Sequence, residues 1–296
     1  MTDRGFSSGG KLAALTVAAL CCFAANSLLC RMALRPGLID PVSFMSVRLL
    51  SGAAVLWLLA LGGDAARGQR VGGGWMGALW LFAYAISFSF AYLRLPAGTG
   101  ALILFGVVQA TMTGAGVARG ERPGALEWSG LLISVCGLVA LTLPGLSAPD
   151  PRGALSMVCA GVGWAFYSLR GRATARPVAS NAGNFLRAVP LTLAVSALTH
   201  AHAHASWRGL MLAAGSGAVA SGIGYVIWYA ALRGLTSTRA GIVQLAVPAL
   251  AAGGGVVLLR ETLSVRLVAS GLAVLGGVLL ATLAHAPVTR SRTPAR

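Results

Sequence analysis

Long apolar runs without a single charged residue recur along the whole chain, and they constrain its fold more than any other feature. Each is about 20 residues long, the length that an α-helix needs to cross the hydrocarbon core of a bilayer. Eight such runs are present: 12–30, 71–93, 95–118, 128–149, 153–169, 209–232, 240–259 and 267–289. Two more, 41–63 and 177–199, are equally apolar but contain one arginine each. Ten membrane-spanning helices are therefore predicted.

The ten runs divide into two sets of five that carry similar residues at similar places. Residues 97–143 align with 237–283 at an offset of 140, which places Glu121 on Glu261. An odd number of spans turns the second set upside down, and inverted repeats of this kind are typical of transporters. The predicted fold is an all-α integral membrane fold, with ten transmembrane helices as two inverted five-helix repeats around a central cavity. The two repeats are residues 1–148 and 149–296.

Composition and charge exclude two broad classes of protein. Hydrophobic residues make up 56% of the chain and charged residues only 10%, which is more apolar surface than one soluble core could bury. The net charge is +16, but the basic residues are spread between the apolar runs, which argues against a nucleic-acid partner. With the N-terminus inside, the cytoplasmic segments hold twice as many basic residues as the outer loops. Both termini are therefore predicted to be cytoplasmic, in a bacterial inner membrane.

Neither a metal centre nor an enzymatic site is predicted. The five cysteines lie inside apolar runs without a CxxC spacing, which is typical of buried free thiols. His200, His202 and His204 alternate in a loop without a carboxylate or thiol nearby, so an incidental polar cluster is favoured over a metal site. No nucleophile is paired with a base inside the predicted helices. We therefore expect no enzymatic activity and no cofactor.

Short motifs recur at equivalent places in the two halves. They are Phe23-Ala-Ala-Asn26 and Trp164-Ala-Phe-Tyr167, then Arg48 and Arg187, then Arg119-Gly-Glu121 and Leu259-Arg-Glu261. At these positions the chain resembles the drug/metabolite transporter superfamily with its paired EamA repeats, and within it the bacterial exporters of aromatic amino acids. The first half departs from the pattern at Val108, where the second half has Pro248. The resemblance implies a transporter of a small-molecule substrate and favours a cavity position for Trp164.

Arg48 and Arg187 are the only charges well inside the predicted helices, and a charge within the membrane is a functional candidate by default. A guanidinium that faces a cavity could bind a substrate carboxylate through two hydrogen bonds. Both arginines lie within two turns of a helix start, so the alternative is that each reaches water or helix-end carbonyls. The inverted repeat places them on opposite sides of the membrane. They are not expected to hold one substrate together.

Aromatic stripes occur on two of the predicted helices. Tyr84, Phe88 and Tyr92 recur every four residues in one helix. In the other, Ser221, Tyr225 and Trp228 lie close to one face. Such stripes could line a cavity that stacks flat substrates, with hydroxyl and indole groups for their polar ends. The alternative for each residue is contact with lipid or a place in an interfacial belt.

Buried amides complete the candidates. Asn26, Gln109 and Gln244 lie within apolar runs, where bonding between helices is the commoner role. Gln244 comes one turn before Pro248, whose ring frees a backbone carbonyl, and is the strongest candidate of the three. For Glu261 a structural ion pair or a gate latch is expected. The predicted substrate-binding residues are Phe23, Asn26, Arg48, Tyr84, Phe88, Trp164, Tyr167, Arg187, Trp228 and Gln244.

The acidic residues all lie at or near predicted helix ends, so no proton relay is expected inside the membrane. The favoured function is export of small, partly apolar metabolites, above all amino acids with aromatic or large apolar side chains. Export would proceed by alternating access, in a monomer or a homodimer. Efflux of other metabolites or toxic compounds and uptake of a sugar-like solute are alternatives within transport. A membrane scaffold subunit is the alternative outside it.

Overall fold

The computed structural model describes residues 4–62, 72–120, 123–143, 148–172, 174, 176–235 and 243–284, and these are almost entirely helical. The first half contains α1 (Arg4–Leu34), α2 (Pro41–Gly62), α3 (Trp75–Arg94), α4 (Ala97–Ala118) and α5 (Ala125–Thr142). The second half contains α6 (Pro151–Arg172), α7 (Pro177–Leu198), η2 (His200–His202), α8 (Trp207–Gly215), η3 (Ser216–Ile223), α9 (Gly224–Leu232), α11 (Ala246–Leu259) and α12 (Val265–Ala284). Within these residues, β pairing is limited to an isolated bridge between Ile39 and Ala205.

Six helical segments among the described residues are long and apolar enough to cross a membrane. They are most of α1, then α2 to α5, and the continuous run Trp207–Leu232 made by α8, η3 and α9. α11 and α12 supply two shorter apolar stretches. α6 and α7 are as long as α2, but α7 carries Asn181, Asn184 and Arg187. The chain is a multi-pass membrane protein, while the number of ten spans stays a prediction.

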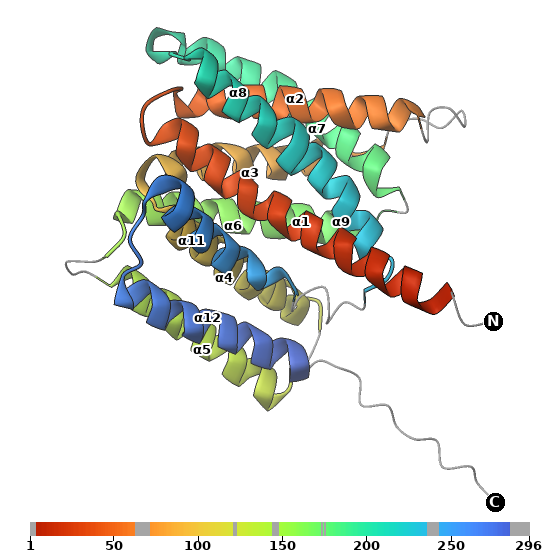
Figure 1. Ribbon diagram of the computed structural model, residues 1–296, viewed down its shortest axis with the longest axis vertical. Helices are drawn as coiled ribbons and strands as arrows, with labels where there is room; N and C mark the ends of the chain where they lie inside the picture. Colours follow the sequence, from red (N-terminus) through yellow and green to blue (C-terminus); the bar gives the residue numbers. More distant parts are fainter. Residues whose placement is uncertain are drawn as a thin grey trace, which may run out of the picture.

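Helices from the two halves pack mainly on each other. Figure 1 shows α5 and α12 together at one end of the molecule and α2, α7 and α8 at the other. Between them, α3 and α4 pack on α6, while α9 and α11 pack on α1. In the predicted repeat, α6 is the counterpart of α1 and α11 is the counterpart of α4. Each of the two first helices, α1 and α6, therefore contacts equivalent helices of the other half. The boundary between the halves therefore runs through the middle of the molecule.

Small residues let α5 and α12 approach closely at their end of the molecule. Gly130 lies against the carbonyl oxygen of Gly277, and Gly277 lies against that of Gly130. The Ser134 hydroxyl donates across the same contact to the carbonyl of Val274 at 3.0 Å. Small side chains and interhelical hydrogen bonds are what hold helices together in lipid, where the hydrophobic effect gives no net attraction. This pair stabilises the fold without lining the cavity described below.

Asp40 joins the loops that precede α2 and α8. Its Oδ1 accepts hydrogen bonds from the backbone N–H groups of Val42 and Ser43 at 3.0 and 2.9 Å, and its Oδ2 accepts one from His204 at 3.0 Å. Burial would raise the pKa of the Asp40 carboxyl, but the hydrogen bonds from Ser43, His204 and Val42 outweigh it and keep that pKa below its usual value. The carboxylate therefore caps the N-terminus of α2 in its ionised form.

Candidate functional site

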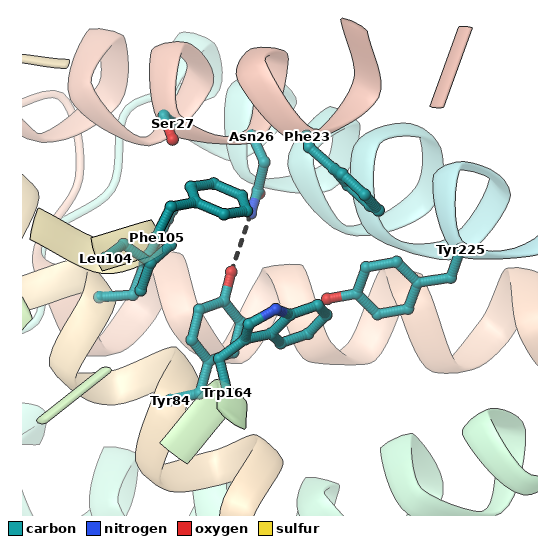
Figure 2. Close-up of a pocket in the computed structure, with 9 residues that line it drawn as sticks. Phe23, Asn26, Ser27, Tyr84, Leu104, Phe105, Trp164 and Tyr225 are labelled. Atoms are coloured by element: carbon teal, nitrogen blue, oxygen red, sulfur yellow. Dashed lines mark hydrogen bonds between the residues drawn. The ribbon is translucent and has the colours of Figure 1, made fainter. Parts of the chain in front are cut away.

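A cavity at the boundary between the halves is enclosed mostly by aromatic side chains. In this conformation its volume is about 20 Å³, which is room for about one water molecule. α1, α3 and α4 of the first half line it together with α6 and α9 of the second. Figure 2 shows these side chains converging from different helices. The lining residues are Phe23, Asn26, Ser27, Tyr84, Phe88, Leu104, Phe105, Trp164 and Tyr225.

The rings around this cavity form one connected group. The ring centroid of Tyr84 lies 5.0 Å from that of Trp164 and 5.2 Å from that of Phe88. Trp164 lies 5.3 Å from Tyr225, which in turn contacts Phe23 at 6.2 Å. These separations are typical of edge and tilted aromatic pairs. The rings fill most of the space between the helices, so an aromatic guest could stack on them only after they move apart.

A chain of hydrogen bonds runs through four helices beside these rings. Ser216 donates to Asn26 Oδ1 at 2.6 Å, and Asn26 Nδ2 donates to the Tyr84 hydroxyl at 3.2 Å (Figure 2 shows the second bond). Arg48 donates to the same hydroxyl through Nη2 at 2.9 Å and to Ser221 through Nε at 3.3 Å. The Tyr84 oxygen accepts twice, which uses both of its lone pairs. Its own O–H is left to donate to a bound molecule.

Arg48 brings to this chain of hydrogen bonds a positive charge that no carboxylate of the described residues balances in an ion pair. Its side chain is 1% exposed, and its Cζ lies 5.1 Å from the ring centroid of Tyr84 and 4.9 Å from that of Phe88. Its Nη1 has no hydrogen-bond partner among the described residues, and neither ion pair found there includes Arg48. An unpaired buried charge is costly, so proteins rarely keep one without a use for it. The guanidinium is therefore suited to attract an anion to the cavity wall.

The π-helix η3 places the two serines of this chain. A π-helix inserts an extra residue in the turn and is often found at functional sites. Ser216 at its start reaches α1, and Ser221 near its end reaches Arg48 on α2. Between them, Gly217 lies directly against the carbonyl oxygen of Arg48, where no side chain would fit. The backbones of α2 and η3 therefore touch next to the buried charge.

Most of the predicted site residues meet at this cavity. Phe23, Asn26, Tyr84, Phe88 and Trp164 line it, and Arg48 lies behind two of them. Two more lie one ring further out. Tyr167 contacts Trp164 at 5.6 Å and donates its hydroxyl to Asn181, while Trp228 contacts Phe23 at 5.7 Å.

Two predicted site residues lie elsewhere. Arg187 is half-buried, and its Nη1 donates to the carbonyls of Gly72 and Gly183 at 3.0 and 2.9 Å. Bonding to backbone carbonyls is the alternative role considered above for this arginine. Gln244 is half-buried just before α11 and is not among the lining residues.

Four residues of the site were not predicted from the sequence: Ser27, Leu104, Phe105 and Ser216. Tyr225 was predicted only as part of the stripe with Trp228 that could line a cavity, and not among the substrate-binding residues. Ser27, Leu104 and Phe105 lie in apolar runs without any distinguishing pattern. The position of Ser216 depends on the π-helix, for which no sequence rule was available.

A buried ion pair links the halves near one end of α1. Arg31 Nε lies 3.1 Å from Glu261 Oε1, and each side chain is 9% exposed. Arg31 also donates to the carbonyls of Tyr92 and Leu93, and Glu261 Oε2 accepts from the backbone N–H of Ala97 at 2.9 Å. The expectation of an ion pair for Glu261 is met by Arg31 of the first half. Glu121, its counterpart in the repeat, lies outside the described residues.

The histidines of the loop before α8 do not form a metal site in the described part of the chain. His200, His202 and His204 are exposed. No group of three or more histidine, cysteine or acidic side chains there is arranged to hold a metal ion.

Comparison with known proteins supports a transporter. Residues 151–283 match the EamA-like transporter family. The second half of the chain is an EamA-like transporter domain. Over 267 residues, the chain is also 50% identical to "Uncharacterized protein PA1977" of Pseudomonas aeruginosa, with 90% of this chain and 92% of that protein covered. The two proteins belong to one family.

A solved crystal structure shares the fold of this chain. It matches with a TM-score of 0.64 and 23% sequence identity, over 90% of this chain and 98% of the other. The predicted resemblance to EamA-like transporters is confirmed over residues 151–283, and transport of a small solute is the role that this match indicates. The finer resemblance to exporters of aromatic amino acids stays a prediction.

Proposed function

We propose that this protein exports small carboxylate-bearing metabolites with an aromatic or large apolar part, amino acids of that kind included, across the bacterial inner membrane. The family match supports transport of a small solute. The observation that carries the choice of substrate is the cavity itself, where rings surround the space and a buried guanidinium without a carboxylate lies behind them.

The rings of the cavity and its hydrogen-bond donors would bind different parts of a substrate. Trp164, Tyr84 and Tyr225 provide faces and edges for a flat apolar group. The Tyr84 O–H and Arg48 provide donors for a carboxylate, which binds a guanidinium through strong charge-assisted hydrogen bonds. The guanidinium lies behind the Tyr84 and Phe88 rings, so a rotation of these rings would bring the carboxylate into direct contact with it.

The arrangement of the halves favours alternating access. Ten spans as two inverted five-helix repeats, with both termini cytoplasmic, account for the way that contacts interconvert when the halves are exchanged. Rocking the halves about the cavity would open it first to one side and then to the other. A single chain supplies all the lining residues, so the unit of transport is one chain, alone or within a homodimer.

The test is counterflow in proteoliposomes that contain the purified full-length protein. Labelled phenylalanine, tryptophan, leucine and phenylpyruvate are offered in parallel, each against its unlabelled form inside. We expect saturable exchange of at least one of the aromatic compounds, abolished by Trp164→Ala. The matched control is Trp128→Ala on α5, because Trp128 is 49% exposed and does not line the cavity. If none of these carboxylates is exchanged, the proposal is wrong about the substrate.

A further inference from the structure

The balance of charge around the cavity narrows the substrate further. The nine lining residues include no acid and no base. Arg48 lies directly behind Tyr84 and Phe88 and gives the site one positive charge. The two carboxylates described above are engaged elsewhere, since Glu261 pairs with Arg31 and Asp40 accepts three backbone N–H groups. The site as described is therefore a cation with no counterion.

Hydrogen-bond donors and acceptors show the same imbalance. Arg48 Nη1 has no acceptor in the part of the chain that the structure describes. The Tyr84 oxygen accepts from Asn26 and Arg48, and its own O–H remains as a donor. The strongest acceptor on the wall, Asn26 Oδ1, has one of its two lone pairs engaged by Ser216 at 2.6 Å, so one is left. A carboxylate needs donors, whereas an ammonium group needs acceptors and favours a carboxylate among them. The site is equipped for the first group and poorly for the second.

We propose that the cavity selects aromatic carboxylates of net charge −1 over the zwitterionic amino acids of the same shape. This inference rests on the proposed function and specifies its substrate class. A monoanion neutralises the Arg48 charge in surroundings of low dielectric constant, where such pairing is strong. An α-ammonium group in the same cavity would face the like charge of Arg48 without an acid to bind it.

A substrate of this charge also supplies a driving force. Each monoanion that leaves carries one negative charge out of a cell whose interior is negative. A potential of 100 mV then favours its export by about 50-fold in concentration ratio. None of the lining residues is a carboxylate or a histidine that could return a proton. Transport is therefore electrogenic and needs no coupling ion.

The experiment compares three compounds with one phenyl ring: phenylpyruvate (charge −1), phenylalanine (zwitterion) and phenethylamine (charge +1). Isothermal titration of the purified full chain in detergent gives the three affinities. Solid-supported membranes carrying proteoliposomes give the transported charge. We expect phenylpyruvate to bind at least tenfold more tightly than phenylalanine, phenethylamine to bind weakest, and phenylpyruvate to produce a current of negative charge.

Variants of Arg48 test whether its charge causes the preference for phenylpyruvate. Arg48→Gln should remove the tenfold preference for phenylpyruvate, whereas Arg48→Lys, which keeps the charge, should retain the order of the three compounds. Arg94→Gln is the matched control, since Arg94 is exposed and pairs with Asp150 at 3.4 Å. Gel filtration shows whether each variant is folded. If a variant is not folded, the affinities of the three compounds for the unmodified protein still test the charge preference.

The outcomes separate this inference from the function on which it rests. Equal or tighter binding of phenylalanine, or transport of phenylpyruvate without net charge, overturns the inference and leaves the proposed exporter intact. Failure of all three compounds to bind or to be exchanged overturns the inference, and the proposed function falls with it if tryptophan and leucine are not exchanged either. A preference for phenylpyruvate that survives in Arg48→Gln would also refute the inference, because the charge would not be its source.

Discussion

At the scale of single residues, the site is a compromise between stability and binding. Arg48 is 1% exposed, and burying a guanidinium without a carboxylate costs several kcal/mol before compensation. Tyr84, Ser221 and the face of the Phe88 ring offset part of this cost. None of these groups accepts a hydrogen bond from Arg48 Nη1. A bound carboxylate would supply an acceptor for Nη1 and a counterion for Arg48. Substrate should therefore raise the stability of the folded protein.

Tyr84→Phe tests the hydroxyl at the centre of this chain. The ring stays, but Asn26 and Arg48 lose their common acceptor and the substrate loses a donor. We expect the free energy of unfolding to fall by about 1.5–3 kcal/mol, because one lost bond involves a charged group. The KM for the transported carboxylate should rise about tenfold.

Tyr92→Phe is the control for that substitution. Tyr92 is buried two turns further along α3, and its hydroxyl donates to the carbonyl of Ala97 at 3.3 Å, outside the cavity lining. Thermal unfolding in detergent and counterflow measure the two effects. A loss of stability without a change in KM is expected for Tyr92→Phe. The same result for Tyr84→Phe would deny its hydroxyl a role in binding.

The carboxyl of Asp40 makes a prediction about pH. Its pKa is lowered in the folded protein, so its contribution to stability is present above the unfolded pKa of about 3.9 and is lost as pH falls through the lower, folded value. The melting temperature of the protein should therefore decline below about pH 4. Asp40→Asn should melt lower at neutral pH and show a weaker decline. Parallel melting curves for both proteins at low pH would contradict this.

At the scale of elements, the sequence predicted helices far better than their internal irregularities. Apolar run length predicted that α1 to α5 exist and placed the ends of α2 and α4 closely, because spanning a bilayer leaves little freedom, while the ends of α1 and α5 differ from the predicted runs. The π-helix of Ser216–Ile223 was not predictable, since no pattern in these residues distinguishes them from the α-helical residues on either side. The pairing of Arg31 with Glu261 was equally hidden, because it joins residues 230 positions apart. Local sequence patterns predict helices, whereas contacts between residues far apart in the sequence are known only once the helices are packed.

Gly217→Ala tests the contact between α2 and η3. The added methyl group would meet the carbonyl of Arg48 and the hydroxyl of Ser51, so α2 must move. We expect a loss of about 1–3 kcal/mol in the free energy of unfolding, typical of overpacking. Affinity for the carboxylate should fall too, because Ser221 and Arg48 move apart. Gly253→Ala on α11 is the control, since open space surrounds that position and alanine favours a helix. Equal stability of the two variants would show that the contact is not tight.

At the scale of the whole molecule, the ion pair of Arg31 and Glu261 is placed to hold the halves together. It joins α1 to the loop between α11 and α12, and through Ala97 to the turn between α3 and α4. These are elements that must separate if the cavity is to open at that end. Since both side chains are 9% exposed, the pair is screened from water and its loss should be felt.

Glu261→Gln therefore has two expected effects. It leaves Arg31 buried without a counterion, which should lower the free energy of unfolding by about 3–5 kcal/mol. The double variant with Arg31→Gln should recover part of that loss, because no charge is then left unpaired. The same change should open this end of the cavity more often.

A membrane-impermeant thiol reagent can detect that opening. A cysteine at Ser27, on the cavity wall, is introduced into a background without the five native cysteines. It should react several-fold faster when Glu261→Gln is added. Arg94→Gln, which breaks an exposed ion pair instead, should leave the rate unchanged. If Glu261→Gln lowers stability while the labelling rate stays constant, the pair only supports the fold, and the latch must be sought among other contacts between the halves.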